Sequence, residues 1–253
     1  MRMILLVLLL SAAVLPAQSV QLSDSQALEI GRRIWRNECA GTVSGLTTWN
    51  AGEEFPSLGI GHFIWYPKGT TGPFQESFPA LIAYLAKDGV AVPDWARGAC
   101  PWKTRAEFQA EINGPKLTEL RTLLKNTIPQ QARFAALRLE QALPKMLAAA
   151  PAGQRDAIKT NFYRVAAQPL GLYALMDYVN FKGEGIKESE RYKGQGWGLL
   201  QVLAAMPTTG PALPAFAKAA DQALSLRVKN SPPERNEAKW LPGWRNRVYT
   251  YSN

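Results

Sequence analysis

Glu38 and His62 are the residues whose types and spacing first suggest chemistry. Glu38 follows Ile34 and Trp35 at helical spacing, which places its carboxyl on the apolar side of a helix, near its C-terminal end. Burial and the negative end of the helix dipole both favour the neutral acid over the carboxylate. A carboxylic acid that keeps its proton near neutral pH is suited to protonate the leaving oxygen of a glycosidic bond.

A glycine-rich segment after Glu38 carries a first motif. Residues 57–63 read Ser-Leu-Gly-Ile-Gly-His-Phe. This segment resembles the Thr-Ile-Gly-Ile-Gly-His-Leu hairpin of the bacteriophage-type lysozymes, which also follows a helix-terminal catalytic glutamate. The resemblance implies that Glu38 is the general acid and that Ser57 stands beside the attacking water. It also implies that His62 closes the motif in a structural role at the substrate site. The two glycines are expected to let the strand approach a sugar chain closely.

The sequence departs from the phage pattern at the position of the second carboxylate. The loop before the hairpin is longer, and Ala51 stands where that carboxylate is expected. Glu53 and Glu54 are the nearby acidic residues, and Glu54 is closer to the hairpin strand. We therefore expect Glu54 to act as the second carboxylate. The alternative for both is an exposed pair in a turn.

A second motif occupies residues 192–202, which read Tyr-Lys-Gly-Gln-Gly-Trp-Gly-Leu-Leu-Gln-Val. It resembles the Gly-x-Gly-Leu-Met-Gln element of lytic transglycosylases and goose-type lysozymes, which share the lysozyme-like fold. A catalytic glutamate, usually followed by serine, precedes that element in the family. Here Glu184 has a comparable spacing, and Glu188 is the glutamate followed by serine. A glycine-rich loop before a buried helix is the alternative interpretation.

Two glutamates therefore compete for the role of the acid. The chain after Gln201 is short for the helices that normally follow such a site, whereas the chain after Glu38 is ample. We expect Glu38 to be the acid, and Glu184, Tyr192 and Gln201 to bind substrate from the opposite side of the cleft.

The elements that position these residues are mostly helical. Ser23 and Gln26 form a capping box that opens the helix leading to Glu38. Residues 41–61 lack helical periodicity and predict a β-hairpin or small sheet. Residues 183–198 form a second glycine-rich irregular stretch. Further helices are predicted at residues 79–86, 105–112, 117–125, 130–149, 155–166, 171–181 and 212–228.

The composition supports one large domain. The 253 residues are 47% hydrophobic and 10% aromatic, which excludes a disordered or collagen-like chain. We expect residues 20–253 to form a single mainly α (α+β) domain, lysozyme-like, with a small β-hairpin after the first helix. One histidine and two cysteines exclude a zinc site of several such ligands in one copy, and no metal or cofactor is expected.

The N-terminal segment predicts export. Arg2 precedes an apolar run over residues 4–15 and a small-x-small site at residues 17–19, so residues 1–19 are expected to be a cleaved signal peptide. An uncleaved membrane anchor is the alternative. In the periplasm or outside the cell, Cys39 and Cys100 are expected to form a disulfide, with two buried thiols as the alternative.

A net charge of +9 favours a polyanionic partner. The basic residues are scattered, as at Arg245 and Arg247, and no nucleic-acid motif occurs. We expect a monomer without stable membrane insertion that cleaves the glycan strands of peptidoglycan as a muramidase. The alternatives are a lytic transglycosylase using Glu184 or Glu38 alone, a chitinase or chitosanase, and a wall-binding protein without activity.

Overall fold

The computed structural model describes residues 22–252, and the predicted signal peptide lies outside this range. The prediction of a mainly helical fold is confirmed, and every segment predicted to be helical overlaps a helix. Within the described range no helix is both long and apolar enough to cross a membrane. The helices are α1 (Asp24–Cys39), α2 (Phe78–Lys87), α3 (Arg105–Ala110), α4 (Pro115–Asn126), α5 (Ile128–Ala149), α6 (Arg155–Ala166), α7 (Gly171–Lys182), α8 (Leu199–Ala205), α9 (Ala212–Asn230) and α10 (Leu241–Tyr249).

The strands are short, and all but β3, which begins two residues after residue 61, fall in the two segments that lack helical periodicity. β1 (Thr47–Thr48), β2 (Ser57–Leu58) and β3 (Phe63–Ile64) form an antiparallel sheet directly after α1. β4 (Arg191–Tyr192) and β5 (Gln195–Gly196) form a separate hairpin between α7 and α8. The predicted small sheet after the first helix is therefore present.

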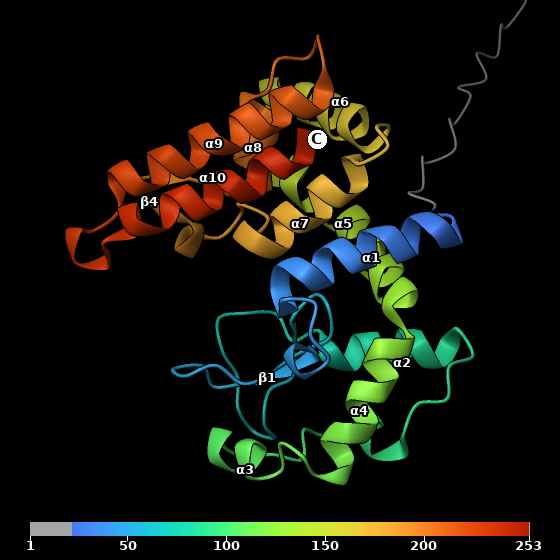
Figure 1. Ribbon diagram of the computed structural model, residues 1–253. Helices are drawn as coiled ribbons and strands as arrows, with labels where there is room; N and C mark the ends of the chain where they lie inside the picture. The colour runs from blue at the N-terminus through green and yellow to red at the C-terminus, as the bar shows by residue number, and fades with distance from the viewer. Residues whose placement is uncertain (1–21, 253) are drawn as a thin grey trace, which may run out of the picture.

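The elements form two groups with α1 and α5 between them (Figure 1). The sheet β1–β3 and helices α2 to α4 lie on one side, and helices α6 to α10 lie on the other. The close packing of α1 on α5 depends on Gly31, because a Cβ there would lie 2.6 Å from Ile128 Cγ2. The C-terminal end of α1, which carries Glu38, consequently lies at the junction of the two groups.

Aromatic side chains fill the core of the group that contains the sheet. Trp65 is 1% exposed and packs on Phe78 at a centroid distance of 4.6 Å and on Trp102 at 6.2 Å. Burial of such large rings supplies much of the hydrophobic stabilisation of a domain. This cluster holds β3 against α2 and so fixes the base of the hairpin.

The turn between β2 and β3 packs directly onto α5. Gly59 has φ +70°, and a Cβ at this position would lie 2.4 Å from Oε1 of Gln131. That same oxygen accepts a 2.9 Å hydrogen bond from the backbone nitrogen of Ile60. Gly61 is equally confined, because a Cβ there would lie 2.8 Å from the ring of Phe63. Contacts within the protein therefore account for both glycines of the motif.

Candidate active site

A cavity of about 350 Å³ lies where the hairpin sheet, α1, α5 and α7 meet. The loop before α2 and the loop after α7 complete its wall. Among the described residues, Glu38 and Glu184 are the two carboxylates of the lining. The polar and charged lining residues are Glu38, His62, Gln75, Ser77, Arg138, Lys145, Asn180, Glu184 and Lys187.

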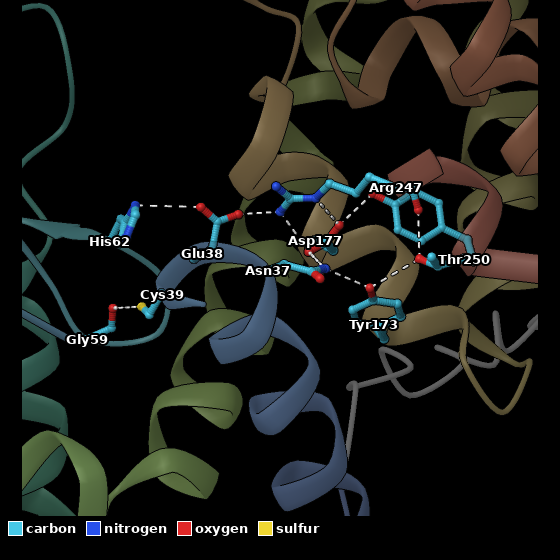
Figure 2. A network of polar contacts seen from close by, with 10 residues as sticks. Asn37, Glu38, Cys39, Gly59, His62, Tyr173, Asp177, Arg247 and Thr250 are labelled. Carbon is cyan, nitrogen blue, oxygen red and sulfur yellow. Dashed lines mark hydrogen bonds and ion pairs between the residues drawn. The ribbon is translucent and has the colours of Figure 1, made fainter. Parts of the chain in front are cut away.

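Glu38 reaches the cavity from the last turn of α1, as the helical spacing predicts. Its side chain is 12% exposed and has a cationic or titratable partner on each oxygen (Figure 2). Nη2 of Arg247 donates a hydrogen bond to Oε1. Nδ1 of His62 lies 3.6 Å from Oε2. The expectation of a neutral acid at the end of α1 did not include this guanidinium.

Arg247 belongs to α10 and is held by the buried Asp177 of α7. Its Nε donates to Oδ2 of Asp177 at 2.8 Å and its Nη2 donates to Oδ1 at 2.8 Å. Tyr251 and Asn37 also donate to Asp177, at 2.6 Å and 3.0 Å. Burial would lower the pKa of Arg247, but the hydrogen bonds and charges of Asp177 and Glu38 outweigh it and raise that pKa. Arg247 is therefore a permanent cation beside the candidate acid.

Sequence reasoning missed Asp177 and Arg247 as site residues. Asp177 lies on α7 among buried neighbours such as Tyr173 and Tyr178, and a carboxylate among apolar residues is a signal for a buried ion pair. Arg247 gave no such signal, because it stands among several scattered basic residues.

His62 occupies a strained backbone position beside Glu38. Its φ of +47° lies in the left-handed region, which is uncommon for residues other than glycine. Its Nε2 is buried and has no hydrogen-bond partner among the described residues. The turn thus directs one ring nitrogen toward Glu38 and leaves the other unsatisfied.

Glu184 lines the cavity from the loop that follows α7. The loop is shaped by Gln201, whose Nε2 donates to the carbonyl of Gly185 at 2.9 Å. Oε1 of Gln201 accepts from the backbone nitrogen of Gly198 at 3.0 Å. The second motif therefore positions the segment that carries Glu184, while Gln201 itself does not line the cavity.

The structure does not bring three further predicted residues to this cavity. Glu54 is exposed in the turn before β2, and Ser57 is 4% exposed within the sheet. Tyr192 lies on β4 and donates a 2.9 Å hydrogen bond to the buried Glu237. Hydrogen bonds from Arg227 and Arg235, with that of Tyr192, overcome the opposing effect of burial and lower the pKa of Glu237 to about 2.

The predicted disulfide between Cys39 and Cys100 is wrong. Both cysteines are free and buried, and they are not near each other. Cys39 ends α1 and lies with its sulfur 3.6 Å from the carbonyl of Gly59. The sulfur of Cys100 lies 3.4 Å from the carbonyl of Trp102, in the aromatic cluster. Pairing by elimination failed because sequence separation carries no information on Cα distance.

The rim of the cavity is crossed by a contact between its two loops. Nζ of Lys187 donates to the carbonyl of Pro73 at 3.1 Å and lies 5.9 Å from the ring centre of Phe74.

Among the described residues, no group of three or more histidine, cysteine or acidic side chains is placed to hold a metal ion. The chain matches no protein-family model, no curated protein and no solved structure.

Proposed function

We propose that this chain is a glycosidase that cleaves the β-1,4-linked glycan of peptidoglycan, with Glu38 as the general acid. It would act in the periplasm or outside the cell after loss of residues 1–19. The observation that carries the proposal is that Glu38, His62 and Glu184 border one cavity. The resemblance of the hairpin after Glu38 to that of phage-type lysozymes supports the same reaction.

The ion pair of Glu38 sets a condition on proton donation. Glu38 must take up a proton before it can protonate a glycosidic oxygen. Because Asp177 binds both Nε and Nη2 of Arg247, the guanidinium stays paired when Glu38 becomes neutral. A substrate oxygen near Glu38 would then replace Arg247 as the partner of the carboxyl group.

Glu184 is the better candidate for the second carboxylate. It lines the cavity with Glu38, whereas Glu54 is exposed outside it. If Glu184 activates water, the reaction is hydrolysis. If it does not, a hydroxyl of the sugar closes an anhydro ring, as in lytic transglycosylases. We favour hydrolysis.

Zymography on purified peptidoglycan tests the proposal. The wild-type protein is expected to clear the wall, and Glu38→Gln is expected not to. Mass spectrometry of the products separates the two reaction types, since an anhydro end is lighter than a reducing end by one water. Cleavage of soluble chito-oligomers but not of peptidoglycan would instead indicate a chitinase or chitosanase.

A wall-binding protein without activity is the second candidate. It is favoured by Ala51, which stands where the phage pattern has a carboxylate, and by the ion pair between Glu38 and Arg247. Such a protein would sediment with peptidoglycan and clear none of it.

A further inference from the structure

The cavity that contains Glu38 and Glu184 is also bordered by three cationic side chains. Arg138 and Lys145 lie about two turns apart on α5, so they share one face of that helix. Lys187 lies on the loop after α7. With three cationic side chains and two carboxylates, the lining of the cavity carries a net positive charge.

Arg138 differs from the other partly buried arginines. Arg121, Arg164 and Arg247 each donate to oxygen atoms of the protein. Arg138 makes no hydrogen bond or ion pair within the described range. Burial lowers the pKa of Arg138, and the charge of Glu184 counteracts that effect. Arg138 borders the cavity without an acceptor from the protein, and a bound anion would supply one through charge-assisted hydrogen bonds.

We propose that Arg138, with Lys145 and Lys187, forms a subsite for a carboxylate of the substrate. This inference rests on the proposed function and specifies its substrate class. A wall glycan carries a lactyl group on alternate sugars, which is a free carboxylate when unsubstituted and otherwise bears a peptide with carboxylates of its own. Chitin has neither. The subsite would therefore select peptidoglycan over neutral glycans of the same linkage.

Titration calorimetry in the Glu38→Gln background measures binding without turnover. The ligands are chito-oligomers, glycan strands stripped of peptide, and peptide-bearing strands. Adding Arg138→Met should weaken binding of the anionic ligands about tenfold or more, the loss expected from one hydrogen bond to a charged group. Binding of chito-oligomers should change less than about twofold on the same scale. Arg138→Lys should restore part of the affinity.

Arg133→Met is the matched control. Arg133 lies on α5 but pairs with Asp24 and does not line the cavity, so its loss should leave all three affinities unchanged. If Arg138→Met fails to give the wild-type circular dichroism spectrum, Lys145→Met tests the subsite from an exposed position. Lys145→Met should weaken binding of the anionic ligands and leave binding of chito-oligomers unchanged.

The outcomes separate the subsite from the proposed function. Equal weakening for neutral and anionic ligands means that Arg138 acts by positioning Glu184, and it overturns the subsite. Unchanged binding, or no binding of any ligand, also overturns it. A selective loss with only stripped strands or only peptide-bearing strands identifies the source of the carboxylate. Selective weakening without wall cleavage by the wild type would support the subsite and refute the glycosidase.

Discussion

Glu38 and Arg247 stand 209 positions apart in the chain and form an ion pair at the cavity. The contact joins the last turn of α1 to α10, and Asp177 of α7 holds the guanidinium from its other side. The candidate acid therefore depends on three helices for its electrostatic environment. The contacts of its carboxyl group are a property of the tertiary fold and not of the helix that carries it.

Glu38→Gln is expected to reduce wall cleavage about 100-fold or more, since glutamine keeps the shape of the side chain and has no proton to transfer. The rate of release of soluble glycan fragments measures the effect. Glu29→Gln is the control, because Glu29 lies on the exposed side of the same helix and pairs with Arg33. Undiminished turnover in the Glu38 variant would remove Glu38 from the mechanism.

Glu184→Gln is expected to lower turnover less than Glu38→Gln does, if Glu38 is the acid that protonates the leaving group. Values of kcat and KM for both variants on the same glycan strands give the ranking. The reverse ranking would assign the acid to Glu184 and make the second motif the catalytic one. An unchanged rate in Glu184→Gln would exclude Glu184 as the base.

Arg247→Met is expected to destabilise the protein by about 3–5 kcal/mol, the usual cost of leaving a buried carboxylate without its cation. Asp177, whose side chain is fully buried, is the carboxylate concerned. Urea unfolding measures the free energy. Arg245→Met, two residues earlier and at an exposed pair with Asp221, should change it little. Similar losses in the two variants would contradict this account.

Cys39 and Cys100 are expected to be free thiols that react only after unfolding. Burial, and secondarily the charge of Glu38, raises the pKa of Cys39 to about 12. Burial raises the pKa of Cys100 to about 11, against the lowering effect of its hydrogen bond to the backbone of Trp102. A thiol reagent at pH 8 should label both cysteines in unreduced, denatured protein and almost none in folded protein. Absence of free thiols in the denatured sample would instead support a disulfide between Cys39 and Cys100.

Lys182 is expected to make the protein more stable as the pH rises. Burial, and then the charge of Arg227, lowers the pKa of Lys182 from its ordinary value of 10.5 to about 6, despite the rings of Trp244 and Phe181. Between these two values the unfolded chain binds more protons than the folded one. The free energy of unfolding should therefore increase with pH across this window, by up to about 1.4 kcal/mol per unit.

Lys182→Met should remove this pH dependence, as measured by urea unfolding from pH 6 to pH 9. Lys159→Met is the control, because Lys159 is exposed on α6 and its loss should leave the slope unchanged. Equal slopes for the wild type and the Lys182 variant would show that Lys182 stays protonated in the folded protein.

The sequence predicted what local rules determine. The capping box of Ser23 and Gln26 is present, with a 3.2 Å bond from the Gln26 nitrogen to Ser23 Oγ, and the helix it opens delivers Glu38 to the cavity. The hairpin after it follows from the change of periodicity and from glycine. Each of these depends on residues only a few positions apart.

What the sequence could not predict depends on distant partners. No pattern in the chain pairs Arg247 with Asp177, because ion pairs between helices depend on packing that periodicity does not encode. Proximity to the hairpin in sequence favours Glu54 as the second carboxylate, yet the turn exposes it. The sequence shows that Arg138 and Lys145 share one face of α5. It does not show that this face borders the cavity.

The position of α10 after α1 and α7 in the chain has a consequence for biosynthesis. Chains emerge from the ribosome N-terminus first, and helices α1 and α7 are complete long before Arg247 and Tyr251 are added. Until then Asp177 has neither the cation nor the hydroxyl that satisfies it in the folded protein. The nascent chain therefore cannot complete the surroundings of Glu38, and a ribosome that stalls before α10 leaves a product without them.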